Sequence, residues 1–90
     1  MQWKPPLPEE ITEHHLLDAF PILSPGECRV LRWLCQGKTD EEIASIIDLA
    51  VTTVSTHVRN MLGKLGLENR VVLVVEVFRA VICGAPRTRG

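Results

Sequence analysis

Residues 39–65 read TDEEIASIIDLAVTTVSTHVRNMLGKL, and this stretch decides the fold. Its start, Thr39-Asp-Glu-Glu42, is a capping box, which predicts a short helix over about 40–47. Residues 48–50, Asp-Leu-Ala, have the composition of a tight turn. Apolar residues then return at helical spacing and predict a second helix over about 51–65. Two helices joined by a three-residue turn form the helix-turn-helix pattern.

The two faces of the predicted helix 51–65 differ in chemistry. No acidic residue occurs from residue 51 to residue 67, although the chain has 11 acidic residues against 10 Lys and Arg. The second helix of a helix-turn-helix motif lies in the major groove of DNA, where an acid-free polar face avoids repulsion by phosphate. The residues expected on that face are Thr52, Ser55, Thr56 and Arg59.

A helix is also predicted on each side of this motif. Ser24-Pro-Gly-Glu27 repeats the capping box, with proline at the first helical position, so a helix is expected over 25–36, where Gly37 ends it. After Asn69, the run VVLVVEVFRAVIC has the valine content of a buried strand. We expect a helix over about 70–82 instead, because a lone strand has no partner and the run exceeds the usual ~4–8 residues.

The N-terminal residues are expected to add one more helix. Pro8 can open a helix over 9–19 and Pro21 stops it. That helix offers apolar side chains to a core, and the predicted fold class is therefore all-α: a four-helix helix-turn-helix bundle with an extra N-terminal helix. Its expected core residues are Ile11, Leu16, Leu17 and Phe20.

Charge divides the chain into three parts. Residues 1–23 carry one basic and four acidic residues, whereas residues 24–83 carry seven of each. We therefore expect an acidic N-terminal extension over 1–23, a helix-turn-helix domain over 24–83 and a flexible tail over 84–90. The net charge of −1 shows no overall basic bias, so nucleic-acid binding must depend on local charge.

Several functional classes are disfavoured by the composition. Adjacent His14 and His15 project about 100° apart on a helix and make a weak metal pair. Cys28, Cys35 and Cys83 have neither a metal-knuckle nor a redox spacing. No catalytic constellation is present, so we expect no enzyme, cofactor or metal. Without an export signal or a long apolar run, the chain is expected in the reducing cytoplasm and not in a membrane.

The sequence of residues 23–70, LSPGECRVLRWLCQGKTDEEIASIIDLAVTTVSTHVRNMLGKLGLENR, resembles the LuxR-type helix-turn-helix domain of bacterial transcription regulators. The resemblance extends over about residues 22–83 and is closest to the output domain of quorum-sensing regulators. It rests on Glu27, Trp33, Gly37-Lys-Thr39, Glu42-Ile-Ala44, Thr53-Val54, His57, Lys64-Leu-Gly66 and Asn69-Arg70.

The resemblance implies a DNA-binding output domain that regulates transcription. In such proteins an acyl-homoserine-lactone-binding domain normally precedes this segment, whereas here 23 residues precede it, so the chain is either a naturally small regulator or a fragment. Four residues depart from the family pattern. Gly26 and Gly63 stand where basic residues are frequent, Ala50 replaces a capping Ser or Thr, and Ser55 replaces a longer polar residue.

Candidate DNA contacts follow from the predicted helix. Arg59 is placed to reach the two major-groove acceptors of guanine, and Ser55 and Thr56 to contact a base edge or a thymine methyl; the bland alternative is a solvated surface. Thr52 and Thr53 lie in the first turn, whose amides favour phosphate, with simple packing as the alternative for Thr53. Lys38 and Lys64 are candidate phosphate contacts.

Three other residues have structural interpretations. Arg70 begins a helix, where a cation needs a partner, so we expect an internal pair between Glu27 and Arg70, with phosphate as the alternative for Arg70. His57 is expected to pack or to bond the backbone rather than contact DNA. Trp33 is expected in the core rather than on a reading surface.

The predicted helix 70–82 is apolar on more faces than one small core can cover. We expect a homodimer on double-stranded DNA, with Val71, Val74, Val75 and Phe78 at the dimer contact. The alternative is a protein-interaction module that pairs with a full-length LuxR-type regulator and modulates it without strong DNA binding. RNA polymerase is a further possible partner.

Overall fold

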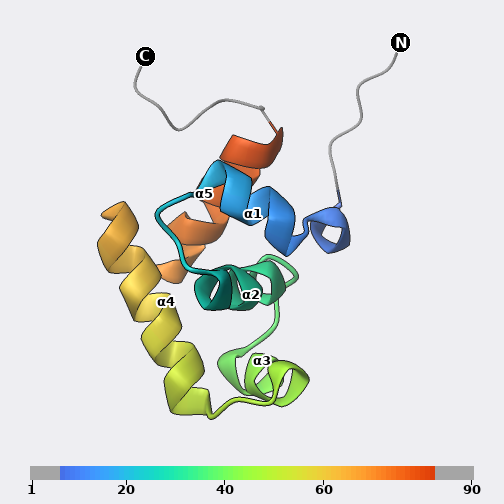
Figure 1. Ribbon diagram of the computed structural model, residues 1–90, viewed down its shortest axis with the longest axis vertical. Helices are drawn as coiled ribbons and strands as arrows, with labels where there is room; N and C mark the ends of the chain where they lie inside the picture. The colour runs from blue at the N-terminus through green and yellow to red at the C-terminus, as the bar shows by residue number, and fades with distance from the viewer. Residues whose placement is uncertain (1–6, 83–90) are drawn as a thin grey trace.

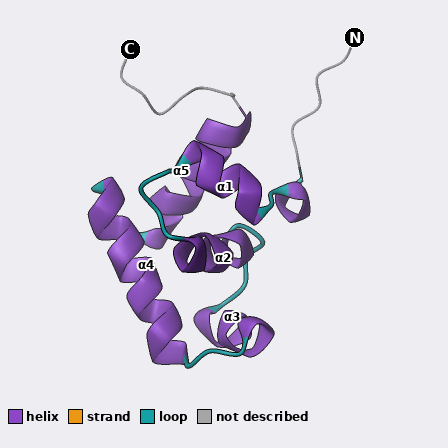
Figure 2. Cartoon of the chain, viewed as in Figure 1, coloured by secondary structure: helices purple, strands orange, loops and turns teal. Residues whose placement is uncertain are grey.

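The computed structural model describes residues 7–82, and within that range every regular element is helical (Figure 2). The all-α prediction is therefore confirmed. The expectations for Cys83 and for the tail 84–90 fall outside the described residues. The elements are a 3₁₀ helix η1 (Pro8–Glu10) and the α-helices α1 (Glu13–Ala19), α2 (Pro25–Leu34), α3 (Asp40–Ile47), α4 (Val51–Leu65) and α5 (Arg70–Ile82).

Both predicted capping boxes are present. The Ser24 Oγ accepts a hydrogen bond from the Glu27 N–H at 3.1 Å, and the Glu27 Oε1 accepts one from the Ser24 N–H at 2.8 Å. Thr39 and Glu42 make the same reciprocal pair at 3.1 and 2.9 Å. Each box satisfies amide donors that would otherwise lack partners at a helix start, so α2 and α3 begin where the sequence predicts.

The valine-rich segment forms α5, as predicted. The Asn69 Oδ1 accepts a hydrogen bond from the Val72 N–H at 3.0 Å and caps the helix. Leu73 and Val77 are fully buried, and α5 packs against α1 and α4. Tertiary burial of one face therefore overrides the low helix propensity of valine.

The N-terminal helix is shorter than predicted, because Ile11 and Thr12 are not helical and break the helix in two. Thr12 begins a new helix: its Oγ1 accepts from the His15 N–H at 3.2 Å, and the His15 Nδ1 accepts from the Thr12 N–H at 3.1 Å. The break turns Ile11 fully into the core. The segment predicted as one helix over 9–19 is thus η1 followed by α1, and α2 also ends two residues early, at Leu34.

Helix α2 lies at the centre of the molecule, with α4 along one side, α3 at one end and α1 and α5 at the other (Figure 1). Helix α1 packs against α2 and α5, so residues 11–23 contribute to the same core. Within residues 7–82 no helix is long and apolar enough to cross a bilayer. The largest fully buried side chains come from all five α-helices or their flanks: Phe20, Ile11, Leu16, Leu31, Ile43, Met61, Leu73, Val30, Val54, Val77 and Cys28.

Candidate nucleic-acid interface

Helix α4 packs on α2 and α3 and leaves one polar face in solvent. Val54, Val58 and Met61 are buried on the packed side. Because α4 contains no Asp or Glu, its solvent side presents no carboxylate, and hydroxyl, amide and guanidinium groups predominate along one face. We call this surface the acid-free face; its exposed residues are Thr52, Thr53, Thr56, Arg59 and Asn60.

The turn between α3 and α4 determines the direction in which α4 leaves α3. Asp48 adopts the left-handed conformation with φ 60°, and the Leu49 N–H donates to the Ala44 carbonyl at 3.0 Å, which ends α3. Ala50 then occupies the N-cap of α4 and offers no side-chain oxygen. The first-turn amides of α4, with Thr52 and Thr53 exposed beside them, therefore have no side-chain cap in the described chain.

Thr56 and Arg59 occupy the middle of the acid-free face. The Thr56 hydroxyl donates to the Thr52 carbonyl at 2.8 Å, so it offers a partner its oxygen lone pairs and its methyl group. Arg59 is exposed and, in the described part of the chain, forms no ion pair. Its guanidinium retains five N–H donors for a ligand.

Ser55 is turned away from this face. It is half-buried, and its Oγ donates to the Asp40 Oδ2 at 2.8 Å. The structure therefore places Ser55 at the contact between α4 and α3, and its hydroxyl proton is already engaged. Of the three residues predicted to contact bases, Thr56 and Arg59 are brought together on the exposed side and Ser55 is not.

The predicted pair between Glu27 and Arg70 is wrong. The Arg70 guanidinium instead forms a two-pronged ion pair with Asp40, at 2.7 and 3.0 Å. Glu27 pairs with Lys64, whose Nζ lies 2.8 Å from the Glu27 Oε1. The reason is geometric: Glu27 is buried at the start of α2, facing the last turn of α4, whereas the turn at Gly66 carries Arg70 towards the start of α3.

Lys64 is thus held by a buried carboxylate. Burial raises the pKa of Glu27, but the hydrogen bonds from Lys64 and Ser24 outweigh it, and the net pKa lies below the ordinary value. Glu27 is 3% exposed, so the pair is a link between α2 and α4 rather than a surface ion pair. The predicted phosphate contact of Lys64 would compete with this bond.

Three further residues that the sequence analysis singled out are Lys38, His57 and Trp33. Lys38 is half-buried and forms no ion pair within residues 7–82. His57 is half-buried, and its Cε1 lies 3.5 Å from where a Cβ on Gly26 would stand, so a larger residue there would contact the imidazole. Trp33 packs against the core with Arg32 over its ring, 5.1 Å from the centroid.

The predicted dimer residues on α5 fall into two groups. Val71 and Val75 are 68% and 50% exposed. Val74 and Phe78, also expected at the dimer contact, are half-buried and pack against the core of their own chain. The unpartnered apolar surface of α5 is therefore narrower than its composition indicates.

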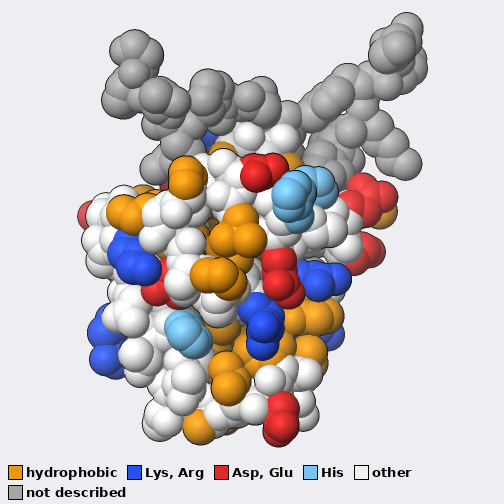
Figure 3. Space-filling model, viewed as in Figure 1, with side chains coloured by type: hydrophobic (Ala, Val, Ile, Leu, Met, Phe, Trp, Pro, Cys, Tyr) orange, Lys and Arg blue, Asp and Glu red, His pale blue; other side chains and the backbone are white. Residues whose placement is uncertain are grey.

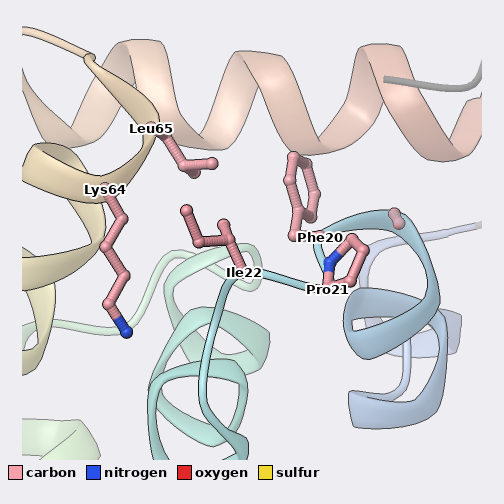
Figure 4. A pocket seen from close by; sticks show the side chains of 6 residues that line it. Phe20, Pro21, Ile22, Lys64 and Leu65 are labelled. Atoms are coloured by element: carbon pink, nitrogen blue, oxygen red, sulfur yellow. The ribbon is translucent and has the colours of Figure 1, made fainter. Parts of the chain in front are cut away.

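The cysteines, the possible metal ligands and one surface hollow were the other candidates for a functional site. Burial raises the pKa of Cys28 to about 11 and that of Cys35 to about 12, so neither thiol is ionised near neutral pH. In the described residues no group of three or more His, Cys, Asp or Glu is placed to hold a metal ion. The hollow has a volume of about 260 Å³ and is lined by Ala19, Phe20, Pro21, Ile22, Lys64 and Leu65 (Figure 4).

Sequence reasoning missed Asp40, which bonds Ser55 and Arg70 at once. An acidic residue directly after a helix cap is explained by the helix dipole alone, so the sequence carried no separate signal for this role.

Basic side chains are scattered across the face shown in Figure 3 rather than gathered in one patch. The acid-free face of α4 instead gathers exposed polar side chains along one helix.

Comparison with known proteins assigns the chain to a family. The chain matches the bacterial regulatory proteins of the luxR family over residues 21–77. It is 38% identical over 58 residues to the nitrate/nitrite response regulator protein NarP of Escherichia coli (strain K12), covering 64% of this chain and 27% of that protein. It is 49% identical over 51 residues to the transcriptional activator protein PhzR of Pseudomonas fluorescens, covering 57% and 21% respectively.

A further relative is VjbR of Brucella abortus (strain 2308), an HTH-type quorum sensing-dependent transcriptional regulator. It is 38% identical over 68 residues, covering 76% of this chain and 26% of that protein. The chain thus spans about a quarter of the length of these relatives. No solved structure matches it. Because the family match covers more than half of the 90 residues, the chain belongs to the luxR family of bacterial regulatory proteins, and residues 21–77 form its helix-turn-helix domain.

Proposed function

We propose that this chain binds double-stranded DNA in a sequence-specific manner and regulates transcription, with α4 in the major groove. The observation that carries the proposal is the acid-free face, where Thr56 and Arg59 are exposed side by side on one helix. A guanidinium without an internal partner can donate two parallel hydrogen bonds to guanine, and a threonine methyl can contact the thymine methyl.

The two ends of the acid-free face suit the DNA backbone. The first turn of α4 presents uncapped amides, Thr52 and Thr53 at the positive end of the helix dipole, which favours phosphate. Lys38 precedes α3 and supplies a further cation for a backbone contact. Lys64 and Arg70 are left out of this set, because each already pairs with a carboxylate of the same chain.

The chain is proposed to act as a homodimer in the cytoplasm. Two exposed valines on α5, Val71 and Val75, form the apolar surface that a second copy would cover. A twofold arrangement about α5 gives two reading helices, and specific readers of this class place them about 34 Å apart on one face of the duplex. Dimeric binding then adds the contacts of two half-sites.

The first test offers the chain a large pool of natural DNA sequences. The purified chain is incubated with fragmented bacterial genomic DNA, and the retained fragments are sequenced. Enrichment of a short repeated motif with twofold symmetry is the expected result. Retention of fragments in proportion to their input, or of none at about 50 mM salt, would contradict sequence-specific binding.

A matched pair of variants then tests the reading helix. Arg59→Ala should cost about 1–3 kcal/mol of binding free energy on the enriched site and relax preference at one base pair. Arg79→Ala removes the same charge from an exposed position on α5 and should leave the preference unchanged. Equal losses on the enriched site and on random duplex for Arg59→Ala would show that Arg59 only positions the protein.

The exposed valines of α5 also favour a second candidate function. In it, the chain pairs through Val71 and Val75 with a full-length luxR-family regulator, or contacts RNA polymerase, and modulates transcription without strong DNA binding of its own. This candidate gains support if the genomic fragments show no enrichment while the chain forms a defined complex with such a regulator. It loses support if the isolated chain binds its site tightly.

A further inference from the structure

Asp40, the first residue of α3, is bonded to two other helices at once. Its Oδ1 accepts from the Arg70 Nη1 at 2.7 Å, and its Oδ2 accepts from the Arg70 Nη2 at 3.0 Å and from the Ser55 Oγ at 2.8 Å. The first two bonds form the parallel fork in which a guanidinium holds a carboxylate most strongly. One side chain therefore joins α3 to α4 and to α5.

The charges in this cluster support one another. Asp40 lies at the positive end of the α3 dipole, which favours a carboxylate, whereas Arg70 begins α5, where the dipole disfavours a cation. Arg70 therefore needs an anion, and the hydrogen bond that it donates lowers the pKa of Asp40 against the opposing effect of burial. Because the Asp40 side chain is only 18% exposed, solvent screens the cluster less than an ordinary surface pair.

Asp40 thus brings together side-chain bonds from α3 to both α4 and α5. The rest of the contact between α3 and α4 is apolar packing around Ile43 and Val54, both fully buried. Apolar packing is not directional, so it tolerates small rotations of one helix against the other. The Asp40 cluster supplies the directional bonds at this contact.

Rotation of α4 matters for reading DNA. Ser55 directly precedes Thr56 and lies one helical turn before Arg59, so the bond from Ser55 to Asp40 sets the direction in which both exposed side chains point. A two-bond contact to a base edge weakens steeply when its angles change.

We propose that Asp40 is a positioning residue for DNA recognition: through Ser55 and Arg70 it holds α4 in the rotation at which Thr56 and Arg59 meet the bases. The proposal rests on the proposed function and adds to it the residue that determines specificity without touching DNA.

The experiment compares two variants with the same charge change one residue apart. Asp40→Asn keeps the shape of the side chain but replaces one acceptor oxygen by an amide donor facing Arg70. Glu41→Gln removes the neighbouring charge in the same turn of α3, where Glu41 is exposed, whereas Ser55 and Arg70 bond to Asp40. Both variants remove one negative charge from the same turn of α3, and only Asp40→Asn alters the cluster.

The measured quantity is the ratio of affinities for the enriched site and for a random duplex of equal length, at one salt concentration. Asp40→Asn should lower this ratio by about fivefold or more, which corresponds to the interaction energies of residues in one network. Glu41→Gln should leave it within about twofold. A ratio for Asp40→Asn equal to that for Glu41→Gln would overturn the proposal.

Ser55→Ala keeps the proposal testable if Asp40→Asn fails to fold. Alanine is a better helix former than serine, so α4 should remain intact and the ratio should still fall. In the Asp40→Asn background, when that protein folds, Ser55→Ala should have no further effect, because Ser55 acts through Asp40. Additive losses would instead show that Ser55 contacts a base directly and would contradict the positioning role.

Failure of the proposed function gives a different result. If the wild-type chain itself shows no preference for any site, then sequence-specific binding is wrong and the positioning role falls with it. If the wild type is specific and both Asp40→Asn and Ser55→Ala keep that specificity, only the inference about Asp40 is wrong. The backbone amide resonances of α4, compared between Asp40→Asn and Glu41→Gln without DNA, give a direct readout: unchanged shifts in both would also contradict it.

Discussion

Two residues lower the intrinsic stability of the reading helix. Ala50 at its N-cap supplies no side-chain acceptor, and Gly63 lies within its last turns. A missing cap costs about 1 kcal/mol and a helical glycine about the same. Helix α4 is therefore held mainly by the burial of Val54, Val58 and Met61 rather than by its own propensity.

Gly63→Ala should raise the free energy of unfolding by about 1 kcal/mol, because alanine loses less backbone entropy in a helix. A Cβ at this position meets no atom within 4 Å. Urea denaturation measures the change. Gly66→Ala is the matched control and should destabilise, because Gly66 has φ +67° in the left-handed region. A loss of stability for Gly63→Ala would show that α4 is strained there.

Ion pairs, hydrogen bonds and apolar contacts hold the helices in their positions relative to one another. The bond from Lys64 to Glu27 joins the end of α4 to the start of α2, and Asp40 joins α3 to α4 and α5. Helix α1 contributes apolar contacts to α2 and α5. Residues 11–23 therefore share one hydrophobic core with the helices that follow them.

The pair between Glu27 and Lys64 should make stability depend on acid. The folded state lowers the pKa of Glu27, so its contribution is fully present above the unfolded-state pKa and is lost as the pH falls through the lower folded-state pKa. Asp40, whose pKa is lowered chiefly by Arg70, acts in the same direction. Urea unfolding from pH 7 to pH 3 should show this loss.

The matched variant is Glu27→Gln, which keeps an acceptor for the Ser24 N–H but carries no charge. It should be less stable than the wild type at pH 7, because Lys64 loses its partner. Its stability should also fall less between pH 5 and pH 3. An equal acid dependence in both proteins would show that Glu27 does not contribute to it.

Helix α1 should be needed for folding. Leu16→Ala should lower the free energy of unfolding by about 2–5 kcal/mol, because Leu16 is fully buried and truncation leaves a cavity. His14→Ala, two residues earlier, alters an exposed side chain whose contact with Asp18 is solvent-screened, and should change stability by less than about 0.5 kcal/mol. Thermal or urea denaturation of both variants distinguishes a packed α1 from a loosely attached one.

For the whole molecule, the apolar surface that stays exposed determines association. Seven large apolar side chains of residues 7–82 are exposed, and of these Val71 and Val75 lie together on one helix. These two residues lie at the start and middle of α5, and Arg70 beside them is held by Asp40. A dimer through α5 would therefore lie next to the cluster that positions α4.

Val75→Glu should convert the proposed dimer into a folded monomer with weaker binding to a two-half-site operator, because a buried charge without a partner opposes association. Leu7→Glu is the matched control, since Leu7 is 49% exposed against 50% for Val75 and lies outside α5. Sedimentation equilibrium measures the mass. A wild-type chain that stays monomeric at high micromolar concentration would contradict the dimer.

The sequence alone determined the features that depend on neighbours within about one helical turn. The capping boxes at Ser24 and Thr39 and the cap at Asn69 require only the spacing of the residues that bond each other. The apolar period of α4 likewise predicts which side is buried and which side carries Thr56 and Arg59. Local hydrogen bonding and helical periodicity are properties of short segments, so they can be read without the fold.

The tertiary structure alone decided which distant groups meet. Arg70 pairs with Asp40 across 30 residues and Lys64 with Glu27 across 37, because partner choice depends on how each helix is rotated and how the turn at Gly66 directs the chain. The same packing places Phe78, half-buried, against the core of its own chain and directs the Ser55 hydroxyl to Asp40. Helix crossing and rotation arise from the fit of whole surfaces, and no local pattern encodes them.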